Sequence, residues 1–339
     1  MDVRPGGRER GPIFAATRDL RTRPTDGSGA RHVAQLWEGD GSMSGREGEG
    51  TEGVNAEVRG PDGQNALSPG SMDRNGAGSR AGPAPWALVT GASGGIGAAI
   101  VRSLARRGWN GVLVARTRDR LEGLAQELER DHGVATHVVV SDLSRQEAPG
   151  EVSEEVARQG IEVDALVNNA GFGDFGPYLD RDDGREQDMI QVNVSALTRL
   201  TRHFAAQMAT RGRGRILNVA STAAFQPGPL MTVYYATKAY VLAFSEALRH
   251  ELADTGVTVT TLCPGPTRSG FQSQAEMEGS RLLRLLPVSE APSVAEFGVK
   301  AMLAGRGVAV PGLLNRLGVV SLRFVPRAWW PALVRKAQE

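Results

Sequence analysis

Residues 86–97 read WALVTGASGGIG. The first five form an apolar run, as expected of a strand that is buried on both faces of a sheet. A turn with Gly91, Gly95 and Gly97 follows, and a helix is expected to start within it. Glycines let the backbone approach a phosphate closely, and the N–H groups of a helix start face the anion. The spacing matches neither G-x-G-x-x-G nor a loop ending in Lys-Ser/Thr, so a tight turn without a ligand stays open.

Strands and helices alternate after Trp86. Helices are expected near 96–107, 118–131, 145–159, 186–211, 233–254 and 292–303. Apolar runs predict strands at 86–90, 111–115, 135–140, 163–167, 215–219, 257–262 and 307–310. Strands that are each followed by a helix imply a parallel sheet with helices on both faces. The sequence therefore predicts an α/β fold, a doubly wound parallel sheet (Rossmann fold) in a single domain, with ligands at the carboxyl ends of its strands.

The first 84 residues differ from the rest in composition. Gly and Pro make up 23 of them, with many charged residues and no periodic apolar pattern. Such a segment cannot bury enough apolar surface to offset the entropy lost on ordering. We expect a disordered extension at 1–84, the folded domain at 85–312 and an apolar, basic tail at 313–339. Met72 lies close to the first strand, and one hypothesis is that the native protein lacks residues 1–71.

Overall composition excludes several classes of protein. The 339 residues are 40% hydrophobic and 23% charged with a net charge of +1, and no basic block suggests a nucleic-acid partner. No apolar run is long enough for a transmembrane helix, and the N-terminus lacks a secretory apolar segment. The single cysteine, Cys263, fits a cytoplasmic location. Without a neighbouring His or a second Cys it is expected to be a packed strand-end residue, and no metal site is predicted.

Tyr234 and Lys238 form a chemically useful pair. Lys238 follows Tyr234 by four positions within a predicted helix, which places both side chains on one face. The chain has only four tyrosines and three lysines. A nearby ammonium lowers the pKa of a phenol, which suits proton transfer near neutral pH. Taken alone, an accidental pair on a helix surface is an equally good interpretation.

Further patterns follow one another along residues 84–270. They are Thr90-Gly91-x-x-x-Gly95-x-Gly97, Asn168-Asn169-Ala170-Gly171, Asn193, Ser221 and Tyr234-x-x-x-Lys238, with Ser221 thirteen residues before Tyr234. In order and spacing they resemble the short-chain dehydrogenase/reductase family, in its compact single-domain subfamily. The resemblance implies that the domain at 85–312 is an NAD(P)-binding catalytic domain acting on CH–OH groups.

The resemblance also implies catalytic roles. Tyr234 would protonate the carbonyl oxygen or deprotonate the alcohol, and Lys238 would lower the pKa of Tyr234 and hold the nicotinamide ribose. Ser221 would donate a hydrogen bond to the substrate oxygen, and Asn193 would anchor a water between Lys238 and solvent. Preorganised donors of this kind stabilise the charge that develops on oxygen. Cap or turn roles for Ser221, Asn193 and residues 168–171 stay open.

The cofactor is expected to be NADP(H) rather than NAD(H). An acid at the end of the second strand would bind a ribose 2′-OH, but here Arg116 follows the strand and suits a 2′-phosphate. Solvated loop charges at Arg116 and Arg118 are the alternative. By resemblance, the other cofactor-binding residues are Gly91, Ser93, Gly95, Ile96, Gly97, Asp142, Asn169, Ala170, Gly171, Tyr234, Lys238, Pro264, Gly265 and Thr267.

Substrate and partners are less defined. By resemblance, residues 267–290 form a lid over the substrate, and they include Phe271, Met277 and several leucines. Phe172, Phe175 and Phe225 are candidate pocket residues. These apolar side chains predict a hydrophobic carbonyl or alcohol substrate, although the lid residues could instead simply pack as core. The resemblance implies a homodimer or homotetramer. The tail is interpreted as a cover for the domain or a subunit interface, with peripheral membrane contact as the alternative. A non-catalytic NADP(H)-binding sensor is the alternative function.

Overall fold

The computed structural model describes residues 83–271 and 288–338. Contacts between Cα atoms divide the chain into two units, Met1–Met72 and Asp73–Glu339, and all described residues belong to the second. The predicted disordered extension at 1–84 lies outside the described residues except for its last two positions. The predicted boundaries at 84/85 and 312/313 stay predictions.

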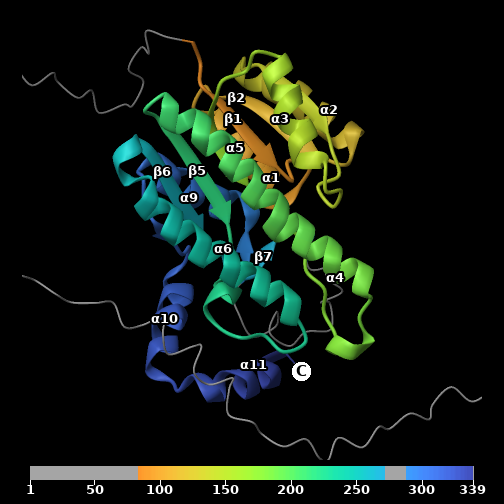
Figure 1. The fold of residues 1–339 in the computed structure, drawn as a ribbon, viewed down its shortest axis with the longest axis vertical. Helices are drawn as coiled ribbons and strands as arrows, with labels where there is room; N and C mark the ends of the chain where they lie inside the picture. Colours follow the sequence, from red (N-terminus) through yellow and green to blue (C-terminus); the bar gives the residue numbers. More distant parts are fainter. Residues whose placement is uncertain (1–82, 272–287, 339) are drawn as a thin grey trace, which may run out of the picture. The chain divides into compact units, whose positions relative to one another are not determined.

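Within the described residues, seven parallel strands form one sheet in the order β3-β2-β1-β4-β5-β6-β9 (Figure 1). They are β1 Trp86–Thr90, β2 Asn110–Ala115, β3 Thr136–Val140, β4 Val163–Asn168, β5 Gly214–Val219, β6 Val257–Leu262 and β9 Val308–Ala309. The strand order reverses direction between β1 and β4, which leaves a crevice at the carboxyl ends of the strands. The predicted doubly wound parallel sheet is confirmed, and every strand boundary lies within one residue of its prediction.

Helices cover both faces of the sheet (Figure 1). One face packs against α1 Gly95–Ala105, α2 Arg118–His132 and α9 Ala291–Leu303, and the other against α3 Ala148–Arg158, α5 Leu197–Thr210 and α6 Thr232–Glu251. Successive strand side chains enter opposite cores: Val89 packs with the first group of helices and Leu88 with the second. Both are fully buried, which explains why the strands read as continuous apolar runs.

The helix predicted at 186–211 has an irregular centre. It consists of α4 Asp183–Ile190, a π-helical segment Gln191–Ala196 and α5. Asp182 caps the start of α4, since its Oδ2 accepts a hydrogen bond from the Arg185 N–H at 2.7 Å. The π-helical segment contains Asn193, one of the predicted site residues.

Several smaller elements were not predicted. Two short strands, β7 Thr267–Arg268 and β8 Ser289–Glu290, pair with each other, and residues 272–287 of the predicted lid lie outside the described residues. The tail contains α10 Leu313–Ser321 and α11 Trp330–Gln338, which Figure 1 shows at the opposite end of the molecule from α2 and α3. Short 3-10 turns at Leu322–Phe324 and Arg327–Trp329 connect them. In the described part of the chain, no helix combines the length and apolar character needed to cross a membrane.

Candidate active site

A cavity of about 1120 Å³ opens at the carboxyl ends of the parallel strands. It exceeds the roughly 300–1,000 Å³ of common small-ligand pockets and leaves room for a dinucleotide together with a substrate. Every predicted site residue lines this cavity except Gly97 and Asn193, which lie behind its wall. The sheet topology therefore gathers residues from positions 91 to 271 into one site.

The glycine turn needs its glycines for two different reasons. Gly91 and Gly95 have φ values of +65° and +54°, where a side chain would be strained. A Cβ on Gly97 would lie 2.2 Å from the Gly91 carbonyl oxygen, so this position is closed to a side chain by packing. As a result α1 begins at Gly95, directly at the cavity wall, with Ser93 and Ile96 beside it.

The segment after β4 holds that turn in place. The backbone N–H groups of Asn169 and Ala170 both donate to Thr90 Oγ1 at 3.0 Å, and Asn169 Nδ2 donates to the Thr90 carbonyl at 2.9 Å. Asn168 turns the other way, and its Nδ2 donates to Asn218 Oδ1 at 2.9 Å between β4 and β5. Asn169, Ala170 and Gly171 therefore reach the cavity, whereas Asn168 ties neighbouring strands together.

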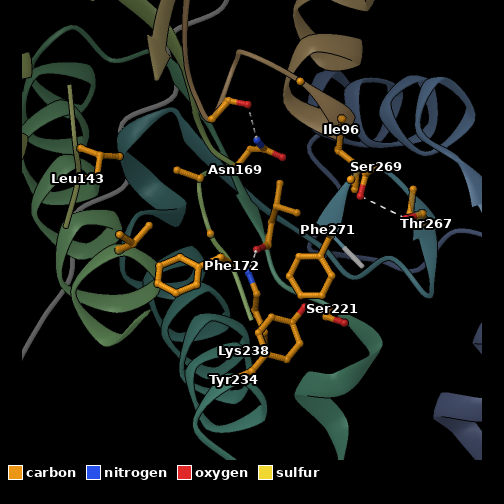
Figure 2. A pocket seen from close by; sticks show the side chains of 18 of the residues that line it. Ile96, Leu143, Asn169, Phe172, Ser221, Tyr234, Lys238, Thr267, Ser269 and Phe271 are labelled. Carbon is orange, nitrogen blue, oxygen red and sulfur yellow. Dashed lines mark hydrogen bonds between the residues drawn. The ribbon is translucent and has the colours of Figure 1, made fainter. Parts of the chain in front are cut away.

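Tyr234 and Lys238 rise from the first two turns of α6 into the cavity beside Ser221 and Phe271 (Figure 2). The Ser221 side chain lies beside that of Tyr234, and its Oγ donates to the Pro264 carbonyl oxygen at 3.4 Å. Ser221 also caps a 3-10 turn, since its Oγ accepts from the Ala223 N–H at 3.1 Å. Lys238 Nζ donates to the Val219 carbonyl oxygen at 2.9 Å and stands 5.7 Å from the centre of the Tyr234 ring. Three of the four predicted catalytic side chains thus meet at one end of the cavity.

Burial controls the protonation of this pair. Desolvation raises the pKa of Tyr234 above its ordinary value, and the nearby Ser221 hydroxyl opposes the rise only in part. Desolvation also lowers the pKa of Lys238 to about 8. The expectation that Lys238 lowers the pKa of Tyr234 is not confirmed, because the loss of water around the buried phenol is the largest influence on this pKa and raises it. In this structure, the neutral phenol is therefore favoured.

Lys238 should make stability depend on pH. The folded protein releases this proton near pH 8, whereas an unfolded chain releases it near about 10.4. Between these values the unfolded state binds more protons at this group, so the contribution of Lys238 to the free energy of unfolding rises with pH by an amount on the order of 3 kcal/mol. Urea unfolding of the cofactor-free protein between pH 7.5 and about 10 measures this rise. The Lys238→Met variant should lose this rise in the free energy of unfolding, and the control Lys336→Met, which changes an exposed lysine, should keep it. If the free energy of unfolding changes with pH equally in Lys238→Met and wild type, Lys238 is not the group responsible.

Asn193 acts from behind the cavity. Its Oδ1 accepts from the Phe172 N–H at 3.1 Å, and its Nδ2 donates to the Phe172 carbonyl at 3.0 Å and to Thr237 Oγ1 at 3.0 Å. A Cβ on Gly171 would lie 2.9 Å from Asn193 Oδ1 and 3.4 Å from Lys238 Nζ. The side chain therefore locks the segment after β4 against α6, while its predicted role in a water relay stays a prediction.

The opposite end of the cavity is rich in hydrogen-bond donors. Arg116 follows β2 and Arg120 stands on the first turn of α2, and neither guanidinium has a hydrogen-bond or ion-pair partner among residues 83–271 and 288–338. Arg118, by contrast, points away from the cavity and pairs with Glu122 at 3.2 Å. Ser141 Oγ lies buried in the wall without a partner in the described part of the chain.

These donors, together with the glycine turn, fit the phosphate groups of a dinucleotide cofactor. The fit includes Arg120, which sequence reasoning missed. Its signal was a second arginine four residues after Arg116, at the start of the next helix. Asp142 lines the same end, and its Oδ1 accepts from the Ser144 N–H at 3.1 Å.

The loop after β6 completes the wall around the glycine turn. The Pro264 carbonyl accepts from the Thr222 N–H at 2.9 Å, and Thr267 Oγ1 donates to the Gly265 carbonyl at 2.9 Å. A Cβ on Gly95 would lie 2.6 Å from the Ser269 carbonyl oxygen, so this loop touches the turn directly. Figure 2 shows Ser269 beside Ile96, a contact that the quoted motifs did not include.

Apolar side chains line the substrate end. Phe172, Met231 and Phe271 lie on the cavity wall, and the Phe271 and Tyr234 ring centres are 5.2 Å apart. Two expected pocket residues are not on the wall. Phe175 packs into the neighbouring core with Met189, and Phe225 packs with Leu242 and Cys263. The remaining apolar lid residues, including Met277, lie outside the described residues.

Helix α11 covers this end of the domain. Val334 and Gln338 are 5% and 1% exposed, and Val334 packs in one cluster with Met231, Tyr234 and Tyr235. Gln338 Nε2 donates to the Tyr235 hydroxyl at 3.1 Å. The helix α11 of the C-terminal tail is therefore part of the second layer around the cavity, in agreement with the interpretation of the tail as a cover for the domain. Cys263 is fully buried, and burial raises its pKa to about 12, so it has the predicted packed position at the end of β6.

Known proteins share this sequence and architecture. The family model for short chain dehydrogenase matches residues 85–279. Mouse 17-beta-hydroxysteroid dehydrogenase type 3 is 37% identical over 181 residues, which cover 53% of this chain and 59% of that protein. The very-long-chain 3-oxoacyl-CoA reductase of Anas platyrhynchos is 35% identical over 185 residues, covering 53% and 58%. The chain thus spans less than two thirds of the length of these curated relatives.

Solved structures match more completely. A short-chain dehydrogenase from Sphingobium yanoikuyae in complex with NADPH has a TM-score of 0.64 and 33% identity, and the match covers 70% of this chain and 92% of that one. The bulky-bulky ketone specific alcohol dehydrogenase from Comamonas testosteroni has a TM-score of 0.60 and 32% identity, covering 72% and 96%. The shared fold and the matched residues together show that this chain belongs to the short-chain dehydrogenase family of oxidoreductases.

Proposed function

We propose that this protein is an NADP(H)-dependent oxidoreductase that interconverts a hydrophobic ketone and its secondary alcohol, with Tyr234 as the general acid and base. The observation that carries the proposal is the buried Tyr234 side chain, which lies beside Ser221 and Lys238 in a cavity that the glycine turn also lines. A phenol held in this way can hydrogen-bond a carbonyl oxygen and transfer a proton to it.

The bound cofactor supplies or accepts the hydride at its nicotinamide ring, and side chains of the protein orient the substrate and transfer the proton. Ser221 and Tyr234 orient the carbonyl and stabilise negative charge on its oxygen. Tyr234 donates its proton in reduction and accepts one in oxidation. Lys238 lies one helical turn away and holds positive charge near this centre when it is protonated, and Asn193 fixes the backbone beside it. Phe172, Met231 and Phe271 exclude water from the reacting end.

Arg116 and Arg120 support NADP(H) over NAD(H). A 2′-phosphate needs charge-assisted donors, and these two guanidiniums stand at the cavity wall beside the end of β2. The NADPH named with the Sphingobium structure agrees with this choice. For the substrate, the relatives named above act on a hydroxysteroid or a very-long-chain 3-oxoacyl-CoA, or are specific for bulky-bulky ketones. An apolar ketone flanked by large groups fits the aromatic wall.

The proposal is tested by NADPH oxidation with a panel of ketones that spans small, aliphatic, aromatic and steroid frameworks. We expect turnover that is fastest for the bulky apolar members and slow for small polar ones. Tight NADPH binding without turnover of any ketone or alcohol would instead favour a non-catalytic sensor. The cytoplasmic location and the homodimer or homotetramer expected from the family stay predictions, which size-exclusion chromatography with light scattering can check for the oligomer.

A further inference from the structure

Large hydrophobic side chains gather on the outside of the C-terminal tail. Of thirteen such residues that are exposed within the described part of the chain, seven lie between positions 313 and 333. Four belong to α10, namely Leu313, Leu314, Leu317 and Val320, and three follow it, namely Phe324, Trp329 and Leu333. We call these seven residues the tail surface. Phe324 is 81% exposed, which is far more than a packed phenylalanine would be.

Part of the tail surface forms one side of α10. Leu313, Leu317 and Val320 follow one another at steps of four and three residues, which places them on one side of the helix, and Phe324 ends the 3-10 turn that directly follows it. The other side of α10 holds it against the domain: the Asn315 side chain lies against Gly265, and the Arg316 guanidinium packs 5.5 Å from the Phe297 ring centre. The apolar side therefore faces away from the fold.

The charged residues of the tail indicate which kind of partner the tail surface would bind. Residues 313–338 contain no Asp or Glu but five basic residues, Arg316, Arg323, Arg327, Arg335 and Lys336. Arg327, Arg335 and Lys336 are exposed, and they flank Trp329 and Leu333 in sequence. An apolar face with basic residues and an exposed tryptophan at its edge is the composition of elements that lie in the headgroup region of a bilayer.

We propose that the tail surface binds the surface of an anionic lipid bilayer, with the apolar side chains in the headgroup region and the exposed Arg327 and Lys336 on the phosphates. The tail lies on the membrane and does not cross it. One consequence rests on the proposed function: α11 covers the substrate end of the cavity, so docking brings that end to a surface where apolar ketones are concentrated. The lipid contact itself does not depend on the reaction.

Vesicle sedimentation of the full chain tests the contact without cofactor or substrate. We expect binding to phosphatidylcholine vesicles with about 30% phosphatidylglycerol, weaker binding to pure phosphatidylcholine, and loss of the difference at high salt. The double variant Leu317→Asp/Phe324→Asp should bind at least roughly tenfold more weakly, and Arg327→Gln/Lys336→Gln should lose several-fold on anionic vesicles only. The matched control Leu179→Asp changes a leucine that is 92% exposed on a different element and should bind like wild type.

Two results would overturn the proposal. One is wild-type protein that stays in the supernatant with anionic vesicles at low salt. The other is a Leu317→Asp/Phe324→Asp protein that binds vesicles as wild type does but changes from oligomer to monomer in light scattering, which would make this face a subunit interface. Circular dichroism and the melting temperature verify that the variants fold, as expected for changes at exposed positions. Ketone reduction without vesicles is measured separately, so an inactive enzyme that binds lipid would refute only the proposed function.

Discussion

Tyr234→Phe is expected to lower kcat for ketone reduction by about a thousandfold while leaving NADPH affinity close to that of wild type. The change removes one buried hydroxyl beside Ser221, but it keeps the ring, whose centre lies 5.2 Å from that of Phe271. The proton donor is lost without a change in the shape of the cavity. Stopped-flow or steady-state NADPH oxidation gives kcat, and fluorescence titration gives the cofactor affinity.

Tyr235 provides the matched control for this experiment. It lies next in sequence, is similarly buried and also faces the cavity, but its hydroxyl accepts a hydrogen bond from Gln338. Tyr235→Phe should therefore cost no more than roughly tenfold, through a small change in how α11 is held. A Tyr234→Phe enzyme that keeps more than a tenth of the wild-type kcat would show that another group handles the proton.

Arg116→Asp is expected to reverse the cofactor preference. The ratio of kcat/KM with NADPH to that with NADH should fall by roughly a hundredfold, because a charge-assisted contact to the 2′-phosphate is replaced by repulsion. The new carboxylate can also accept a hydrogen bond from the free 2′-OH of NADH, which adds to the change. Initial rates with both cofactors at a fixed ketone concentration measure the ratio.

Arg118→Asp separates this effect from a general change of charge. Arg118 stands two residues away and pairs with Glu122 off the cavity, so its replacement changes the net charge equally without touching the cofactor end. We expect the ratio to shift by less than roughly threefold in this control, and Arg120→Ser to give an intermediate loss. Equal shifts for Arg116→Asp and Arg118→Asp would mean that long-range charge, rather than a bound 2′-phosphate, sets the preference.

The strands were predictable because each is buried on both faces. Leu88 and Val89 enter opposite cores, so neither position tolerates a polar side chain and the run stays apolar from end to end. The catalytic motifs were predictable for a similar local reason. Gly91 and Gly95 adopt positive φ, which favours glycine, and Tyr234 and Lys238 share one helix face, which requires a spacing of four. Each requirement can be recognised within a few residues of sequence.

Other features depend on contacts between distant segments. Asn193, in the π-helical segment, forms hydrogen bonds with Phe172 and Thr237, which lie 21 and 44 residues away. Apolar periodicity contains no information on such distant contacts, and it therefore predicted an unbroken helix. Helix α11 is short and buries only Val334 and Gln338, and its composition alone indicates a surface segment. Its place over Tyr235 follows from tertiary packing.

The sequence by itself determined the class of fold, the family resemblance and the residues that could carry proton transfer, because these rest on backbone conformation and on spacing along one element. Tertiary structure decided three further matters. It brought Arg120 and Ser269 to the cavity and kept Phe175 and Phe225 away from it. It left an apolar and basic face of the tail exposed. It also reversed the expected shift of the Tyr234 pKa, since the loss of water around a buried pair depends on everything packed against it.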